Sequence, residues 1–358
     1  MQKKTIKLLR NKINKLDLHI LHLLNERIKI IKDVACIKLK ENKNIYVPER
    51  ESEIYKTMLT HNKGPMQQDS LKAIYREIMS ASLASQKIIK IAYFGQAYSF
   101  THLASMKKFG ASVKYISCSN ITDVFKEVET KRCDYGVVPI ENSTEGVITH
   151  TLDMFVDYEV KISSEIYLDI SHNLYANCSS EKIRKIYSNP MVFGQCRLWL
   201  EANMPNVELR EVASTTKAAE IASREKFSAA IASELAGKKY KLRKISEAIQ
   251  DTSFNMTRFL VISKDYAGRS TKNDKTSIVF SIKDKVGALH DILVPFKKGK
   301  INLTKIESRP SRLKAWDYYF FVDMQGHYED KKIKNAIAEV EKHCNFLKIL
   351  GSYPKDEY

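Results

Sequence analysis

The sequence lacks the long apolar runs of membrane proteins, because no stretch approaches the roughly 20 residues that a spanning helix needs. Residues 1–10 are too polar to hold the apolar core of a signal peptide. The six cysteines are scattered and form neither a CxxC pair nor a cluster with histidine. This excludes a recognisable disulfide framework or zinc site. Together these absences favour a cytoplasmic protein with reduced thiols.

The chain also lacks a strand–Gly-x-Gly-x-x-Gly–helix unit, which argues against a nicotinamide-dinucleotide enzyme. The net charge of +17 is carried mostly by single lysines, without a dense basic block. Residues 1–90 hold 19 Lys and Arg against 9 Asp and Glu, or +10. Nucleic acid, an anionic surface and small anionic substrates all remain open as partners. The richness in Lys, Asn and Ile is typical of AT-rich coding sequence, and favours compositional drift over nucleic-acid binding.

The pattern of 358 residues changes twice, which predicts three domains. Residues 1–90 read as all-helical, with a turn at 42–44 and a third helix over about 69–87. Strands and helices alternate over 91–264, which predicts an α/β domain with a largely parallel sheet. A polar linker at 264–275 follows. The order βαββαβ over 275–354 predicts an α+β ferredoxin-like module.

The first 38 residues read as one helix with an apolar heptad seam, which only Arg27 interrupts. An isolated helix gains too little stability to persist, so this one is expected to pack against others along its length. An arginine in the seam is costly to bury unless an anion meets it. Alternatively, it snorkels to solvent or specifies register. The seam comprises Ile6, Leu9, Ile13, Leu16, Ile20, Leu23, Ile30, Val34 and Ile37.

Lys38 lies close to Arg27 in azimuth and about 16 Å along the helix axis, so both side chains could hold one small dianion. Arg10 lies about 25 Å from Arg27 in the other direction. If Arg10 serves such a site, it serves the partner's copy in an antiparallel dimer. Ser82 and Gln86 are i,i+4 neighbours on the third predicted helix.

These residues resemble the all-helical chorismate mutase family, an intertwined dimer that isomerises chorismate to prephenate. This Claisen rearrangement needs no nucleophile, acid or metal, but it needs two held carboxylates and a stabilised ether oxygen. The resemblance implies that Arg27 and the partner's Arg10 bind carboxylates. It implies that Lys38 and Gln86 donate to the ether oxygen. The matching pattern is Leu9-Arg10-x-x-Ile13, Leu16-Asp17, Glu26-Arg27, Lys38, Pro48-Glu49-Arg50-Glu51 and Ser82-x-x-x-Gln86.

The second predicted helix opens with Arg50 and Glu51. By the same resemblance, Glu51 accepts from the ring hydroxyl of the substrate, with Arg50 and Ser82 nearby. Val47 stands where many relatives carry an aspartate near that hydroxyl. This departure concerns the orientation of the substrate and leaves the expected reaction unchanged.

In the middle segment, polar stretches lie where strands should end or helices begin, at 141–144, 214–216 and 257–259. The last is expected to precede a strand over 260–263. Hydroxyls, amides and an arginine at such places would form a carboxylate-binding cleft. Capping and turn chemistry alone would explain 214–216.

This segment resembles prephenate dehydratase, which implies two α/β lobes arranged like a periplasmic binding protein. The implied reaction removes carbon dioxide and water from prephenate to give phenylpyruvate, without cofactor or metal. The matching pieces are Phe94-Gly95, Ser99-x-x-His102-Leu103-Ala104, Pro139-Ile140-Glu141-Asn142-Ser143, Ser188-x-Pro190, Gln195-Cys196 and Asn255-x-Thr257-Arg258-Phe259.

The resemblance implies that Thr257 helps the ring hydroxyl leave, as a hydrogen-bond donor that polarises it. Arg258 would position a carboxylate or the neighbouring loop. His102 is a candidate supporting group, and residues that would contact the substrate are Glu141, Asn142 and Ser143. One motif departs from the family: relatives show Gly-Pro-x-Gly where this chain has Gly95-Gln96-Ala97-Tyr98, so a bulky residue stands where backbone freedom was available.

In the last segment, 286–289 and 307–310 resemble the paired motifs of the ACT domain. That domain binds phenylalanine at a subunit interface and inhibits the dehydratase. Read alone, 307–310 is equally a strand end with a turn. His290 stands where relatives carry an apolar residue. The implied effector-binding residues are Gly287, Ala288, Leu289, Glu307, Ser308, Arg309 and Pro310.

The sequence therefore predicts a cytoplasmic enzyme that resembles the bifunctional chorismate mutase–prephenate dehydratases. Its expected ligands are chorismate, prephenate and the effector L-phenylalanine, with no cofactor, metal, nucleic acid or membrane. A homodimer or higher homo-oligomer is expected. Two alternatives remain: a mutase fused to prephenate dehydrogenase, and a basic nucleic-acid-binding or phenylalanine-sensing regulator with decayed catalytic sites.

Overall fold

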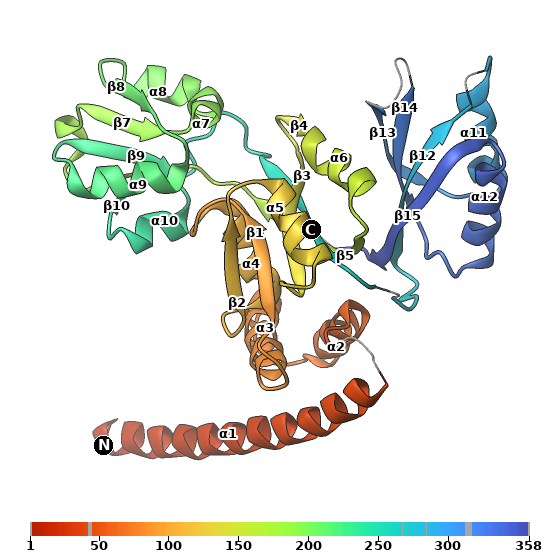
Figure 1. Cartoon of the computed structure of the whole chain (residues 1–358). Helices are drawn as coiled ribbons and strands as arrows, with labels where there is room; N and C mark the ends of the chain where they lie inside the picture. The colour runs from red at the N-terminus through yellow and green to blue at the C-terminus, as the bar shows by residue number, and fades with distance from the viewer. Residues whose placement is uncertain (1, 42–44, 267, 284, 312–316, 357–358) are drawn as a thin grey trace. The chain divides into compact units, whose positions relative to one another are not determined.

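The computed structural model describes residues 2–41, 45–266, 268–283, 285–311 and 317–356 (Figure 1). The predicted turn at 42–44 lies outside these residues. The chain divides into two compact units. The first comprises Met1–Ile89 with Phe109–Lys114, and the second comprises Lys90–Lys108 with Tyr115–Tyr358.

The first unit is built from three helices, α1 (Gln2–Lys40), α2 (Pro48–His61) and α3 (Gln68–Ala84), as the sequence predicts. Pro48 and the acidic Glu49 and Glu51 in the first turn of α2 suit a helix N-terminus. The prediction that Gln86 lies on the third helix is wrong, because α3 ends at Ala84. None of the helices in the described ranges is long and apolar enough to cross a membrane.

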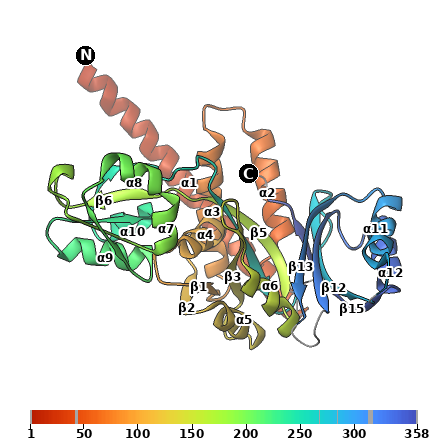
Figure 2. The same cartoon turned by 90° about the horizontal axis from the view of Figure 1, so that it is seen from above.

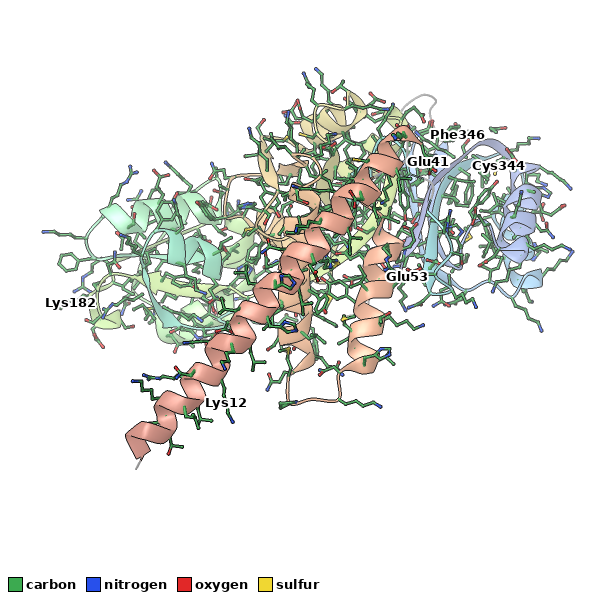
Figure 3. All side chains as sticks on the ribbon, turned by 90° about the horizontal axis from the view of Figure 1, so that it is seen from below. Lys12, Glu41, Glu53, Lys182, Cys344 and Phe346 are labelled. Carbon is green, nitrogen blue, oxygen red and sulfur yellow. The ribbon has the colours of Figure 1, made fainter. Side chains whose placement is uncertain are left out.

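The apolar seam of α1 is exposed to solvent in the single chain. All nine of its apolar residues are between 44% and 64% exposed. Among the residues of α1 whose burial the structure describes, only Ala35 is buried. Figure 3 shows side chains projecting along α1 from Lys12 to Glu41. The expected packing of α1 along its length is therefore not provided by its own chain.

The second unit begins with an α/β lobe whose sheet has the order β2-β1-β3-β11-β5, with β4 paired to β3. Helices α4 (Phe100–Phe109), α5 (Ile121–Glu129) and α6 (Thr149–Asp157) accompany it. Strand β11 arrives late in the chain, between β3 and β5. The strands are β1 (Lys90–Phe94), β2 (Lys114–Cys118), β3 (Tyr135–Asn142), β4 (Gly146–Val147), β5 (Lys161–Asp169) and β11 (Met256–Ser263).

A second lobe lies between β5 and β11 in the sequence, and its sheet has the order β10-β6-β9-β7-β8. Figure 2 shows this lobe, with helices α7 to α10 labelled around β6. The chain thus crosses between the lobes twice, which confirms the two-lobed α/β prediction. Its elements are β6 (Asn173–Ala176), a 3-10 turn (Ser180–Lys182), β7 (Lys185–Ser188), α7 (Pro190–Gln195), α8 (Arg197–Asn203), β8 (Glu208–Glu211), α9 (Thr215–Arg224), β9 (Ser228–Ala232), α10 (Glu234–Lys239) and β10 (Arg243–Ser246).

Both sheets are mixed, so the expectation of largely parallel pairing is wrong. Strand β1 runs parallel to β3, and β7 runs parallel to β8 and β9. However, β11 is antiparallel to both β3 and β5. A strand that returns from the second lobe enters the first sheet from the opposite end, and this reverses its direction.

The C-terminal module has the predicted βαββαβ order and an antiparallel sheet, β13-β14-β12-β15. One face of the sheet packs on its two helices through residues such as Ile278 and Phe280. The other face contributes Val279 and Tyr353 to the core of the first lobe. The elements are β12 (Asp274–Ile282), α11 (Ala288–Lys298), β13 (Leu303–Pro310), β14 (Tyr318–Gln325), α12 (Lys331–Glu341) and β15 (Cys344–Pro354).

Candidate functional sites

Arg27 connects α1 to α3 in the first unit. Its guanidinium donates to the hydroxyl of Ser82, which is buried and itself donates to the carbonyl of Ile78 at 2.6 Å. Burial lowers the pKa of Arg27, and the charge of Arg50 lowers it further while Tyr75 opposes the change. The seam arginine is thus held in a partly desolvated place where an anion would be favoured.

Other predicted mutase residues gather near the ends of these helices. Gln86 donates from Nε2 to the carbonyl of Ser82 at 3.1 Å, so it folds back beside the partner of Arg27. Lys38 donates from Nζ to the carbonyl of Ile45 at 2.9 Å, and burial lowers its pKa while Glu49 raises it. The structure therefore brings Arg27, Ser82 and Gln86 together and holds Lys38 near the start of α2.

The remaining mutase candidates differ in their surroundings. Glu51 is buried and accepts from the hydroxyl of Tyr46 at 2.7 Å. Arg50 is 69% exposed and pairs with Glu53 at 2.9 Å. Arg10 is exposed on α1. Its place near the other end of the helix agrees with the separation from Arg27 that the helical rise predicts.

In the second unit, Thr257 and Asn142 form the end of a strand pair. They are direct partners in the register of β11 and β3, and Asn142 Nδ2 donates to Thr257 Oγ1 at 2.8 Å. The other amide atom, Asn142 Oδ1, accepts from the backbone N–H groups of Thr144 at 2.9 Å and Glu145 at 3.0 Å. Because a backbone N–H only donates, the amide of Asn142 has one orientation, and its nitrogen faces Thr257.

A series of hydrogen bonds connects this pair to three further polar side chains. Asn142 Nδ2 also donates to Asn255 Oδ1 at 2.9 Å, and Asn255 Nδ2 donates to Gln195 Oε1 at 3.1 Å. His172 Nε2 lies 2.7 Å from the same Gln195 oxygen. The chain of bonds runs from the first lobe to α7 of the second. His172 is buried, and burial lowers its pKa while the bond to Gln195 raises it.

Sequence reasoning assigned no role to Asn255, Gln195 or His172. Gln195 and Asn255 lie inside the motifs that carried the resemblance, so those motifs were the available signal. Asn255 and Gln195 come into contact because the chain crosses between the lobes twice. Ser143, a predicted substrate contact, instead bridges the loop before β11: it donates to the carbonyl of Phe254 and accepts from Met256 N, both at 2.9 Å.

The side chains of Glu141 and Arg258 do not lie on the same face of the sheet as those of Thr257 and Asn142. Strand β11 begins at Met256, rather than at the expected position 260, so Thr257 and Arg258 are neighbours within it and point to opposite faces. Glu141 accepts from Lys305 of β13 at 2.7 Å. Arg258 is buried against the C-terminal module.

The motif after β1 that differs from the family, residues 95–98, forms a loop with left-handed backbone at its two ends. Gly95 has φ +92° and Tyr98 has φ +69°, a region that favours glycine. Tyr98 N donates to His102 Nδ1 at 3.0 Å, and the carbonyl of Tyr98 accepts from Ser233 Oγ at 3.0 Å. His102 thus supports the loop, and burial lowers the pKa of its imidazole.

Ser214 caps α9, as the turn-chemistry interpretation of 214–216 predicts, by accepting from Lys217 N at 3.1 Å. Its hydroxyl also donates to Gln96 Oε1 at 2.9 Å. The loop after β1 therefore contacts the second lobe through both Gln96 and Tyr98.

In the C-terminal module, Gly287 has φ +78° immediately before α11, which a residue with a Cβ would adopt only at a cost. Ala288 is buried, whereas Leu289 is 40% exposed. Residues 307–310 form the end of β13, as the alternative interpretation expects, but the strand continues to Pro310 and so these residues contain no turn. Arg309 pairs with Asp153 of α6 through two bonds of 3.1 and 3.2 Å.

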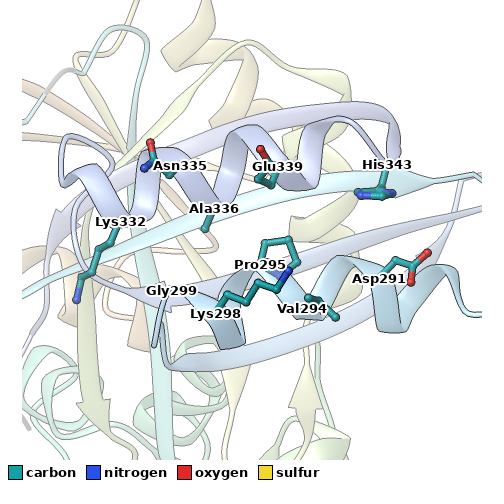
Figure 4. A pocket seen from close by; sticks show the side chains of 10 residues that line it. All are labelled: Asp291, Val294, Pro295, Lys298, Gly299, Lys332, Asn335, Ala336, Glu339 and His343. Carbon is teal, nitrogen blue, oxygen red and sulfur yellow. The ribbon is translucent and has the colours of Figure 1, made fainter.

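A groove of about 540 Å³ lies between α11 and α12 (Figure 4). Its charged lining mixes signs, with Lys298 and Lys332 against Asp291 and Glu339. The residues that line it do not include 287–289 or 307–310. In the described part of the chain, no three His, Cys, Asp or Glu side chains are grouped so as to hold a metal ion.

Three family models match consecutive parts of the chain. Chorismate mutase type II matches residues 9–87, prephenate dehydratase matches residues 91–267, and the ACT domain matches residues 276–342. The solved prephenate dehydratase of Arthrobacter aurescens, in complex with L-Phe, has a TM-score of 0.70 at 30% identity. The similarity covers 74% of this chain and 90% of that one.

Two full-length relatives share the same order of domains by name. The bifunctional chorismate mutase/prephenate dehydratase of Aquifex aeolicus is 51% identical over 98% of both chains. The enzyme of the same name from Stutzerimonas stutzeri is 42% identical, again over 98% of both. The chain therefore belongs to the family of bifunctional chorismate mutase/prephenate dehydratases.

Proposed function

We propose that the chain performs two consecutive reactions at separate sites, under feedback control by L-phenylalanine. The first unit isomerises chorismate to prephenate. The first two lobes of the second unit convert prephenate to phenylpyruvate. The C-terminal module senses phenylalanine, the amino acid whose carbon skeleton phenylpyruvate already has. The order of the three matching family models along the chain supports this division.

For the mutase step, the chain offers cations and amides and needs no reacting side chain. Arg27, fixed by Ser82, would bind a carboxylate of chorismate, and Lys38 and Gln86 would donate to the ether oxygen as its charge develops. Glu51 would accept from the ring hydroxyl. Lys38 and Gln86 would then exchange their present backbone partners for the ether oxygen. Because charge develops on that oxygen, these bonds would be stronger in the transition state than in the bound substrate.

The same site requires a second copy of the chain. The exposed seam of α1 would pack against the seam of a partner, since nine apolar side chains in a row are unstable in water. In an antiparallel arrangement, the partner's Arg10 would reach the site that contains Arg27. The exposure of Arg10 in the single chain agrees with this assignment.

For the dehydratase step, the observation that carries the proposal is the bond from Asn142 to Thr257 Oγ1. With its oxygen accepting, the threonine hydroxyl has its proton available for the substrate. In prephenate, the bond between the ring and its carboxylate breaks, and carbon dioxide is released. The electron pair enters the ring, the ring C–O bond breaks, and hydroxide leaves and takes up a proton as water. Thr257 would polarise that leaving oxygen, and aromatisation supplies the driving force.

We assign the effector site to Gly287, Leu289 and the residues 307–310. The left-handed Gly287 lets a ligand approach the first N–H groups of α11, where a carboxylate is favoured. Arg309 already binds Asp153, so its part would be to connect the effector strand to α6. Chorismate, prephenate and phenylalanine are thus the ligands we assign, within a homodimer or larger homo-oligomer.

A single reaction course tests the proposal. The full chain receives chorismate, and chorismate, prephenate and phenylpyruvate are measured against time. We expect chorismate to fall, prephenate to rise and decay, and phenylpyruvate to accumulate, with the last step slowed by phenylalanine. Prephenate that accumulates without decay, beyond its slow reaction in buffer, would contradict the dehydratase assignment.

A further inference from the structure

The end of the β3–β11 pair has two faces with different neighbours. On one face, Asn142 bonds to Thr257 at 2.8 Å. On the other, Arg258 lies 4.0 Å from Glu141, its direct partner in the register. Because consecutive residues of a strand share one backbone, a movement of Arg258 also moves Thr257.

The guanidinium of Arg258 is held by three side chains and is 7% exposed. Its Nε donates to Glu165 of β5 at 2.8 Å, within its own lobe. Its two terminal nitrogens donate to Asp323 of β14 at 2.6 Å and to the Tyr353 hydroxyl of β15 at 3.0 Å. Two of the three partners therefore belong to the ACT module.

These partners are themselves fixed from the ACT side. Ser277 of β12 donates to Asp323 at 2.6 Å and bonds to the Tyr353 hydroxyl at 2.7 Å. Lys275 of β12 pairs with Glu165 at 2.7 Å. The buried cluster thus contains two cations and two carboxylates, and each ion has a partner of opposite sign.

The ladder between β11 and β3 is interrupted beside this cluster. The register of β11 on β3 shifts between Arg258 and Phe259, which leaves Ile140 as an extra residue in β3. A bulge interrupts the backbone ladder and bends the strand locally. On its other edge β11 pairs with β5 without a shift from Met256 to Val261. The side-chain contacts of Arg258 therefore add to one continuous ladder and one interrupted ladder.

We propose that Arg258 is a positioning residue for the dehydratase reaction, anchored by Asp323 and Tyr353 of the ACT module, and that it keeps Thr257 directed toward the substrate. The proposal rests on the role proposed above for Thr257. It assigns Arg258 no contact with prephenate. The ACT module would then hold part of the dehydratase site in shape, in addition to binding its effector.

Two ACT substitutions on the full chain test this. Asp323→Asn should lower the dehydratase kcat by about tenfold with KM within about twofold, because orientation rather than substrate affinity is lost. Tyr353→Phe should lower kcat less, since it removes only one acceptor and keeps the ring. Mutase activity should stay unchanged in both. Glu159→Gln is the matched control: it removes another ion pair with the ACT module, Lys348–Glu159 at 2.8 Å, and should keep the wild-type kcat.

A second arm separates positioning from loss of structure. In a Thr257→Ala background, Asp323→Asn should cause no further fall in kcat, because it acts through the missing hydroxyl. If Asp323 had only a structural role, Asp323→Asn would lower kcat by the same factor in the wild-type and Thr257→Ala proteins. That result would overturn the inference. Wild-type kcat in both ACT variants would also overturn it.

The other possible results distinguish loss of folding, failure of the proposed function and failure of this inference. If calorimetry shows that Asp323→Asn does not fold, Tyr353→Phe decides alone, since it preserves the volume of the core. Full dehydratase activity in Thr257→Ala would overturn the proposed function together with this inference. An enzyme that depends on Thr257 but is indifferent to Asp323 and Tyr353 would overturn the inference alone.

Discussion

The amide nitrogen of Asn142 donates to the hydroxyl oxygen of Thr257, and backbone N–H groups of the following turn hold the amide in that orientation. The direction of this bond decides what Thr257 offers to a substrate. A hydroxyl that accepts from a neighbour keeps its proton for a third group. The chemical role of Thr257 is therefore set by Asn142.

Asn142→Asp should reverse the direction of that bond. A carboxylate accepts only, so the threonine proton would turn toward residue 142 and away from prephenate. We expect the dehydratase kcat to fall by about a hundredfold, the lower range for a lost proton donor. Steady-state rates with prephenate measure this. Asn120→Asp, at the N-cap of α5, is the control, because it makes the same substitution at a residue bonded to Ser119 and Asp123 instead of Thr257. A variant with the wild-type rate would show that the amide direction does not matter.

Arg27→Ala should remove mutase activity by at least about a hundredfold, because it deletes a desolvated carboxylate partner. Dehydratase activity with added prephenate should remain. Lys29→Ala, on the exposed side of the same helix, should leave both rates unchanged. Loss of both activities in a folded Arg27→Ala protein would contradict the assignment of separate sites.

A mixture of two inactive variants should recover mutase activity if each site uses two chains. Arg10→Ala and Arg27→Ala each damage every site in their own homodimers. After unfolding and refolding together, random pairing would rebuild one intact site in each mixed dimer, or about a quarter of all sites. Chorismate consumption before and after mixing measures this. Absence of recovery, with dimers confirmed by sedimentation, would show that both arginines act within one chain.

Acid should destabilise the second unit through His172. Burial keeps its folded pKa below the unfolded value of about 6.5, so the unfolded chain binds the proton first as pH falls. Stability is then full above about pH 6.5 and declines below it. In the described part of the chain, Nδ1 of this buried ring has no hydrogen-bond partner, so a proton there would be unsatisfied.

Calorimetry between about pH 7.5 and 5.5 would detect this loss. His172→Gln should show a shallower decline, since glutamine does not titrate. The control is His150→Gln, at an exposed position of α6. An equal decline in wild type and His172→Gln would assign the acid sensitivity to other groups.

Local patterns in the sequence were sufficient to predict the long helix α1 and to locate the motifs. The heptad of α1 predicts a continuous helix because its period depends only on the spacing of neighbours. Arg27 stands out as a candidate site residue for the same reason, because it interrupts that spacing. The same pattern predicts that the seam packs against other helices, but it does not say that those helices lie outside the chain.

The start of β11 was misplaced because Thr257 and Arg258 are polar, whereas alternation of apolar residues is the usual sign of a strand. Their partners lie far along the chain, Asn142 for Thr257 and Asp323 and Tyr353 for Arg258, and no local pattern reveals them. The family resemblance assigns Glu141 to the substrate, whereas in the structure its carboxylate accepts from Lys305 of β13. A strand position that is one residue off reverses which side chains face the site.

The loop at Tyr98 illustrates the opposite case. The sequence shows a bulky residue where relatives carry glycine, and the backbone there is indeed left-handed. The structure adds what offsets the cost: bonds to His102 and Ser233, and Lys239 Nζ 5.3 Å from the centre of the tyrosine ring. Two of these partners lie in the second lobe, beyond the reach of local reasoning.

The two faces of β11 also limit how this gene can change. A slip of β11 by one residue against its neighbours would turn the hydroxyl of Thr257 toward the ACT sheet and the guanidinium of Arg258 toward Asn142. The contacts on both faces of the strand would be lost at once, although no side chain had been replaced. Length changes should therefore accumulate among homologues in the connections outside the strands, such as residues 264–273, and be absent from β11 itself.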